Sequence, residues 1–236
     1  MLLQALNDTI KKVARHDTMI EIWGLPENVF DMSEGIYTYA HSNVTTGMIY
    51  RAKKAERKGF DGVIIGEVGA VEAEYALKEI LSIPVIGASE SCFLLGLALG
   101  VNFSILTYSD KAYAWLYRTV RDYGLERKCV SIRQADIPED DLTTRDAMDN
   151  IYKKLLEEAN RAIKEDRAEV ILLASVGLAG LADHLRKRIS APVVDPVEAG
   201  VKFAEMLVDL NKSKGLLHSK LLSYKPSPNI DKVLRT

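Results

Sequence analysis

The chain contains two copies of one sequence pattern, and the second copy begins 108 positions after the first. Residues 63–69 match residues 171–177 at every hydrophobic position, and at the same offset residues 82–86 match residues 190–194. Each copy has an apolar strand, a helical segment and a second strand. A repeat of this kind indicates two pseudo-symmetric half-domains whose equivalent loops face a shared cleft.

Outside the repeat, short apolar segments continue to alternate with segments of helical spacing. We predict strands over residues 19–23, 61–66, 84–87, 102–107, 128–133, 168–174 and 192–194. We predict helices over residues 3–15, 44–58, 70–81, 89–99, 110–124, 144–165, 178–188 and 196–212. Short strands that lack polar–apolar alternation and are joined through helices are typical of parallel sheets covered on both faces. The expected fold class is therefore α/β, doubly wound.

The segments between these elements suggest how the chain is divided. We expect one half-domain from residues 1–100 together with 198–236, and a second from residues 101–197. Residues 27–43 form a long polar and aromatic segment, and a loop of that length is usually functional or a lid. The tail from Ser213 carries prolines and is expected to extend over the surface.

Composition excludes several classes of partner and location. The 236 residues are 47% hydrophobic and 27% charged, which is typical of a soluble globular protein. A net charge of −2 gives no electrostatic reason to expect nucleic acid or an anionic membrane as a partner. Two cysteines make no disulfide framework or zinc spacing, so a reduced, cytoplasmic compartment is expected. The first residues lack the basic region of a signal peptide, and the apolar run at 92–101 is too short to span a bilayer.

The candidate site follows from where ligands bind in open α/β folds. They bind beyond the carboxyl ends of the strands, which here correspond to the loops at 66–70, 87–91, 107–110, 174–178 and 194–198. Each loop lies just before a helix, so its backbone N–H groups could receive an anion such as a carboxylate.

Glu67 and Ser175 occupy the same place in the two copies of the repeat, and they differ in chemistry. A half-buried carboxylate in a cleft could serve as a general base, although Glu67 could instead only complement a helix N-terminus. Ser175 could bind substrate, cap a helix or act as a nucleophile. Because a serine nucleophile needs an adjacent base, and Glu67 is the only one that the repeat places nearby, we name both as candidate catalytic residues.

The same loops supply candidate substrate-binding residues. Ser89 fits a helix N-cap, and a first-turn position would lower the thiol pKa of Cys92, although a small buried thiol is the alternative. Thr107 and Tyr108 end a strand and could bind substrate or cap the next helix. The full set of expected binding residues is Val68, Gly69, Ser89, Glu90, Cys92, Thr107, Tyr108, Val176 and Gly177.

Cofactor and metal sites are not indicated by the sequence. The histidines, at 16, 41, 184 and 218, show no metal-ligand spacing, and no glycine-rich phosphate loop is present. Tyr37, Tyr39 and His41 suggest a lid over a planar group or a surface that packs against a partner subunit.

Taken together, these segments resemble the aspartate/glutamate/hydantoin racemase superfamily, and most closely its hydantoin-racemase-like branch. The resemblance runs from residue 3 to about residue 226, and the segments that carry it are 59–65, 83–90, 103–107, 169–173, 177–179, 191–195 and 219–226. It implies two flavodoxin-like halves, a cofactor-free site between them and a homo-oligomer. The family begins with a strand that precedes the first helix of this chain, so either that strand lies upstream or the sheet lacks it.

The resemblance also implies a two-cysteine mechanism, which this chain cannot use unchanged. Racemases of the family use two cysteines on opposite faces of a carbon next to a carbonyl, and the matching positions here are Glu67 and Ser175. A serine hydroxyl is too weak an acid or base to replace a thiol of pKa about 8.5. We therefore expect an isomerase or racemase acting on a small carboxylate or hydantoin-like substrate with Glu67 as its single base. Protonation would come from water, Tyr108 or Cys92. The alternatives are a hydrolase of a small cyclic ureide or amide, and a non-catalytic binding protein.

Overall fold

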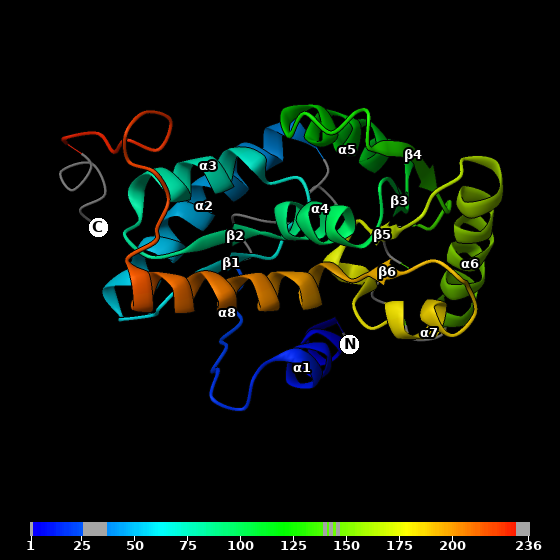
Figure 1. The fold of residues 1–236 in the computed structure, drawn as a ribbon, viewed down its shortest axis with the longest axis horizontal. Coiled ribbons are helices and arrows are strands. Elements are labelled where there is room, and N and C mark those ends of the chain that lie inside the picture. The colour runs from blue at the N-terminus through cyan, green and yellow to red at the C-terminus, as the bar shows by residue number, and fades with distance from the viewer. Residues whose placement is uncertain (1, 26–36, 139–140, 142–143, 145–146, 230–236) are drawn as a thin grey trace.

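The computed structural model describes residues 2–25, 37–138, 141, 144 and 147–229, and Figure 1 shows their arrangement. The strands are β1 (Val63–Ile65), β2 (Val85–Gly87), β3 (Phe103–Thr107), β4 (Cys129–Gln134), β5 (Ile171–Leu173) and β6 (Val193–Val194). The helices are α1 (Leu2–Val13), α2 (Thr38–Arg57), α3 (Val71–Ile80), α4 (Ala88–Leu99), α5 (Asp110–Asp122), α6 (Met148–Glu165), η4 (Val176–Leu178), α7 (Ala182–Arg186) and α8 (Pro196–Lys214).

The described strands form two sheets, and every pairing in them is parallel. β1 pairs with β2, and the second sheet has the order β4-β3-β5-β6. β1, β2, β5 and β6 are short and wholly apolar because helices cover both faces of each sheet, whereas the edge strand β4 carries Ser131, Arg133 and Gln134. The predicted α/β class is confirmed, and the carboxyl ends of the strands in each sheet lie along one edge.

Side chains of the second sheet alternate between two hydrophobic clusters. Ile171 and Leu173 lie in a cluster with side chains of α6 and α7, whereas Leu172 lies in a cluster with side chains of α4 and α5. In the first sheet, α2 and α3 contact β1 and β2 on one face, and α8 runs along the other (Figure 1). Both sheets are therefore doubly covered.

Helix α4 lies between the two sheets, in the middle of Figure 1. It contacts β2 of the first sheet, β5 and β6 of the second sheet, and α8. This position explains the buried apolar side chains of the helix, such as Cys92 and Phe93, whereas Leu94 and Leu99 on its other side are exposed.

The structure departs from the predicted elements in three places. Residues 19–23 form no strand, because Met19 is 94% exposed and the segment pairs with no described strand. Helix α2 begins at Thr38 instead of residue 44, since a buried face carrying His41 and Val44 extends it toward the N-terminus. Residues 26–36 of the expected loop lie outside the described residues. The helix predicted over 178–188 is divided into η4 and α7, with Gly180 at a φ of +83° between them.

The C-terminal segment docks on the first half of the molecule. Helix α8 continues to Lys214, two residues into the predicted tail, and Gly215 ends it with a positive φ. Beyond it, the ring Nε2 of His218 accepts a hydrogen bond from the backbone N–H of Val85 at 2.8 Å. The ammonium group of Lys220 donates to the carbonyl groups of Glu79 and Leu81. As far as residue 229, the tail has no helix or strand after α8, and these contacts anchor it.

Candidate active site

The loop after β1 holds Glu67 in a fixed frame. Gly69 has a φ of +103°, and its backbone N–H donates to the hydroxyl of Ser89 at 2.8 Å. This contact joins the loop after β1 to the start of α4. Ser89 is therefore not the N-cap of α4, which is Gly87, and its hydroxyl is used inside the protein. The Glu67 side chain is 20% exposed, so it is half-buried at the carboxyl end of β1.

His41 lies beside the Glu67 carboxylate. Its ring Nε2 is 3.6 Å from Oε1 of Glu67, and its side chain is 9% exposed. The ring meets Trp115 edge to face, with centroids 4.4 Å apart and planes at 79°. Trp115 also packs on Gly69, where a Cβ would lie 3.0 Å from the indole. Because Trp115 comes from α5, which follows β3, the second sheet contributes to the wall beside Glu67.

Ser175 lies at the equivalent place after β5. Its Oγ accepts a hydrogen bond from the backbone N–H of Gly177 at 3.0 Å, so it is the N-cap of η4. Among the described residues no acceptor is found for its own hydroxyl proton. A half-buried hydroxyl in this state can donate to an oxygen of a ligand.

Two further polar side chains, at the ends of neighbouring strands, have no hydrogen-bond partner among the described residues. Thr107 Oγ1 at the end of β3 and Gln134 Oε1 at the end of β4 are buried and have no hydrogen-bond partner in the described part of the chain. The two residues are opposite each other in the parallel register. Buried polar atoms are rarely left unsatisfied, so these two are candidates for contact with a ligand.

The two catalytic candidates flank one part of the core. Val68, next to Glu67, packs against the hydrophobic cluster that contains Ala174, next to Ser175. The backbone N–H of Ala174 donates to the carbonyl of Leu106 at 3.0 Å, which sets the Ser175 loop beside Thr107. Val176 is half-buried in that loop, and the contact of Glu67 with Ser175 stays a prediction.

A hollow of about 310 Å³ adjoins this region between the start of α2 and α5. Glu67 and Ser175 do not line this hollow. His41 and Gly69, which lie beside Glu67, do line it. The residues of its wall that bear on the site are His41, Gly69, Glu72, Trp115, Arg118 and Asp122.

The remaining expected binding residues are placed deeper in the protein. Cys92 is 3% exposed in the core, and burial raises its thiol pKa well above the usual value. The expected lowering by the helix N-terminus is therefore wrong, because loss of water outweighs the helix dipole. Tyr108 is 8% exposed in the cluster with α6. Roles of Cys92 and Tyr108 in binding stay predictions.

Glu90 belongs to a buried ionic cluster behind the site. Its carboxylate accepts from the Lys78 ammonium at 2.6 Å, and Lys78 also donates to Glu74 at 2.6 Å. The hydroxyl of Tyr123 donates to Glu74 at 2.9 Å. Burial, with the nearby Glu90 charge, raises the pKa of Glu74 to about 7, and a Cβ on Gly87 would lie 1.8 Å from its carboxylate.

The sequence placed His41 in a possible lid but did not pair it with Glu67, and it did not indicate Gln134 as a site residue. His41 lies in the segment between two predicted elements, and its proximity to Glu67 depends on helix α2 beginning earlier than its apolar spacing indicates. A signal for Gln134 was present, because it follows the apolar strand β4 in the way that Thr107 follows β3.

Comparison with known proteins gives consistent matches. The model of a family described as Asp/Glu/Hydantoin racemase matches residues 2–204. A hydantoin racemase from Pseudomonas sp. (strain NS671) is 38% identical over 182 residues, which cover 76% of this chain and 69% of that protein. A hydantoin racemase from Paenarthrobacter aurescens is 28% identical over 224 residues, covering 94% and 91%. The crystal structure of an allantoin racemase from Pseudomonas fluorescens aligns with a TM-score of 0.80 at 29% identity, covering 96% of this chain and 92% of that one.

Proposed function

The chain belongs to the Asp/Glu/hydantoin racemase family, and from this we propose that it inverts or exchanges an acidic C–H centre of a small hydantoin-like ring without a cofactor. The family resemblance drawn from the sequence is confirmed. The matched relatives are named for hydantoin and allantoin, which are rings with an acidic carbon next to a carbonyl. Such a carbon can be deprotonated by a positioned base because the charge moves to the carbonyl oxygen.

Glu67 is the proposed base. It removes the proton from the ring carbon, and the C–H electron pair enters the ring as an enolate. The observation that carries the proposal is the half-buried Glu67 carboxylate at the carboxyl end of β1, held by the Gly69–Ser89 contact and by the His41–Trp115 pair. A base in such a frame needs little reorganisation when it takes the proton.

Ser175 is proposed to bind the substrate, with the hydroxyl of Thr107 beside it. The Ser175 hydroxyl already accepts from Gly177, so its proton is directed to an acceptor such as the enolate oxygen. The buried Thr107 hydroxyl offers a second contact to a polar ring atom. Hydrogen bonds to the oxygen on which charge develops stabilise the transition state.

Water is the proposed proton donor on the opposite face of the ring: it gives a proton to the enolate carbon, and the hydroxide that remains takes the proton from Glu67 through solvent, which restores the carboxylate. Cys92 lies in the core with a raised thiol pKa, so it is a poor candidate for reaching a ring carbon. Tyr108 is packed in the cluster with α6. A water molecule that enters beside Ser175 would place solvent deuterium in the product when the reaction is run in heavy water.

The test is exchange of the ring C–H of a single-enantiomer 5-monosubstituted hydantoin in deuterated water, followed by NMR and chiral chromatography. We expect exchange and loss of optical purity with the native protein. Glu67→Gln should lower both by about 10²–10⁴-fold, since that is the usual contribution of a general base. Ser175→Ala should retain part of the activity, and Glu126→Gln at an exposed position should behave as the native protein.

Three results would contradict this function. Full activity of Glu67→Gln would remove the base. Release of a ring-opened product would indicate a hydrolase, and tight binding of the hydantoin without exchange would indicate a binding protein.

We also propose that the protein works in the cytoplasm as a homo-oligomer. Both cysteines are unpaired, and no helix in the described part of the chain is long and apolar enough to cross a membrane. Leu94 in the middle of α4, Leu99 at its end and Val101 just after it are 46%, 50% and 64% exposed, and exposed apolar side chains favour association. Light scattering after size exclusion would give the mass, and a monomer at micromolar concentration would contradict the oligomer.

A further inference from the structure

We propose that His41 is a positioning residue that orients the Glu67 carboxylate in the substrate-bound state. The inference rests on the proposed function, because it assigns a partner to the base of that reaction. It adds a residue that neither the repeat nor the pattern of the strands indicates.

The first observation is a buried nitrogen without a partner. The Nε2 atom of His41 makes no hydrogen bond to any described residue, and His41 as a whole is 7% exposed. Its nearest ionic neighbour is Oε1 of Glu67, at 3.6 Å. A buried polar atom in this condition is unusual in folded proteins and calls for a specific explanation, such as a role in catalysis.

The second observation is that the ring of His41 is restrained. Trp115 packs against it edge to face at 4.4 Å, and His41 sits on the first turns of α2, where its backbone N–H donates to the carbonyl of Tyr37. The carboxylate is on a loop, with Gly69 held by Ser89 just beyond it. A restrained ring beside a loop carboxylate can set the direction in which that carboxylate points.

From these observations we infer that a hydrogen bond forms between His41 and Glu67 when substrate binds. Catalytic hydrogen bonds are often long in unliganded structures and shorten in the complex. A small movement of the Glu67 side chain would bring Oε1 to about 2.8 Å from Nε2, the usual length for a charge-assisted bond. Nε2–H would then donate to Oε1, which leaves Oε2 to face the ring carbon and take its proton.

The contact between Trp115 and His41 joins elements that belong to different sheets. Trp115 belongs to α5, after the first strand of the second sheet, whereas His41 and Glu67 belong to elements around the first sheet. Trp115 contacts both His41 and Gly69. A single side chain from the neighbourhood of the second sheet therefore holds both the His41 ring and the loop of Glu67.

The experiment measures kcat and KM for hydantoin exchange in native protein, His41→Phe, His41→Gln, Glu67→Gln and the double variant His41→Phe/Glu67→Gln. Phe keeps the ring packing against Trp115 without the donor, and Gln restores an N–H donor without the ring. We expect His41→Phe to lower kcat by about 10²-fold, the usual effect of a misplaced catalytic group, with KM little changed. His41→Gln should recover part of that loss. His16→Gln, on the exposed loop after α1, is the matched control.

If His41 acts by positioning Glu67, the losses of kcat in the two single variants should not add in the double variant. In the double variant, His41→Phe should cause no further loss beyond that of Glu67→Gln, since the residues act as a unit. Unchanged kcat in His41→Phe, or fully additive losses, would overturn the proposal for His41 and leave the function intact. An inactive native protein, or an active Glu67→Gln, would instead show that the proposed function has failed. The far-UV spectrum and thermal midpoint of each variant exclude unfolding as the cause.

Discussion

Among single residues, the chemistry of the two thiols is the clearest difference from a mechanism based on paired cysteines. Cys92 is in the core with its pKa raised by burial, and burial raises the pKa of Cys129 to about 12. Neither thiol is a thiolate at neutral pH, and thiolates are the reactive form. The two loops equivalent in the repeat carry a carboxylate and a hydroxyl instead.

We therefore predict that the native protein resists thiol alkylation without losing activity. Iodoacetamide at pH 7.5 should label neither cysteine in an hour at about 25 °C, whereas both should react after unfolding in guanidinium. Mass spectrometry of the intact protein measures the labelling, and hydantoin exchange measures activity. Rapid inactivation in proportion to labelling at Cys92 would contradict the assignment of that residue to the core.

The sequence was informative about Glu67 and Ser175 because the repeat places them at equivalent positions. It placed His41 in a possible lid but did not pair it with Glu67, since the side chain reaches the site through helix α2 and a packing contact with Trp115, 74 positions away in the chain. For Cys92 it left a lowered thiol pKa and a small buried thiol as alternatives, because position in a helix predicts the dipole and does not predict burial; the structure shows the buried thiol. Contacts between distant segments decide both cases.

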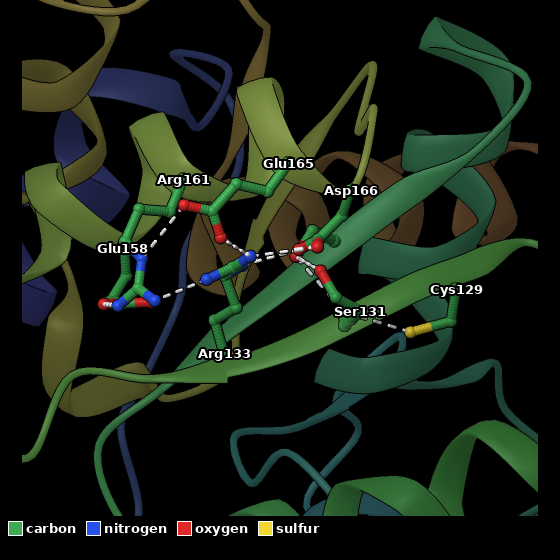
Figure 2. A network of polar contacts seen from close by, with 8 residues as sticks. Cys129, Ser131, Arg133, Glu158, Arg161, Glu165 and Asp166 are labelled. Atoms are coloured by element: carbon green, nitrogen blue, oxygen red, sulfur yellow. Dashed lines mark hydrogen bonds and ion pairs between the residues drawn. The ribbon is translucent and has the colours of Figure 1, made fainter.

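Among the secondary-structure elements, β4 and α6 are joined by one arginine. Figure 2 shows Arg133 of β4 directed toward three carboxylates at the C-terminal end of α6 and just after it. Its guanidinium donates to Asp166 at 2.5 and 2.9 Å, to Glu165 at 2.7 Å and to Glu158 at 3.3 Å. Arg161 also contacts Glu158 and Glu165 but is 56% exposed, against 14% for Arg133. Arg133 is therefore the centre of the network.

We predict that Arg133→Met lowers the free energy of unfolding by roughly 1–2 kcal/mol, because it leaves partly buried carboxylates without their donor. Arg161→Met, at the exposed edge, should change it little. Urea unfolding at pH 7 measures both. The Arg133 guanidinium holds the pKa of Asp166 below its ordinary value of 3.8, so this contribution is present at neutral pH and is lost as the pH falls below about 4. Equal losses in the two variants would contradict the central role of Arg133.

The elements themselves were largely predictable because buried parallel strands are continuous apolar runs. The segment 19–23 has the same composition as a strand, yet Met19 and Ile22 are exposed and no described strand lies beside it. Strand formation depends on a neighbour as well as on composition. The start of α2 and the break at Gly180 were missed for a related reason, since helix ends depend on local packing and backbone geometry.

For the whole molecule, the ionic cluster of Glu74, Lys78, Glu90 and Tyr123 connects parts that are distant in sequence. It joins α3 and α4 beside the first sheet to Tyr123 at the end of α5. The ammonium of Lys78 also lies over the ring of Tyr224 in the C-terminal segment, 5.9 Å from its centroid. The cluster therefore links α3 and α4 to α5 and to the C-terminal segment.

This cluster gives the stability of the whole protein a pH dependence. The pKa of Glu74 is near 4.5 when unfolded and is raised to about 7 by burial in the folded protein. Between these values the folded protein keeps a proton that the unfolded chain has released, so the contribution of Glu74 falls as the pH rises from about 4.5 to 7. Lys78, whose pKa is raised, loses its contribution only above about pH 10.5.

We predict that Glu74→Gln removes the fall in stability that the titration of Glu74 causes. Relative to the native protein, the variant should gain up to about 3 kcal/mol between pH 5 and pH 7.5, because its amide does not titrate. Urea unfolding at several pH values measures the difference. His218 acts in the opposite direction, since burial and the Lys78 charge lower its pKa to about 4 and its contribution is lost as the pH falls below about 6.5. Its effect cancels between the two proteins. Parallel stability curves would contradict the raised pKa of Glu74.

A repeat in the sequence accounts for the architecture of parallel sheets, but it does not give the contacts by which α5 reaches the Glu67 loop.

The most direct measurement is a crystal structure with a 5-monosubstituted hydantoin bound. Our account predicts the ring between the loops after β1 and β5, with the acidic carbon facing a carboxylate oxygen of Glu67 and a ring oxygen within hydrogen-bonding distance of Ser175. A ligand bound solely in the hollow beside Arg118, touching neither side chain, would contradict it.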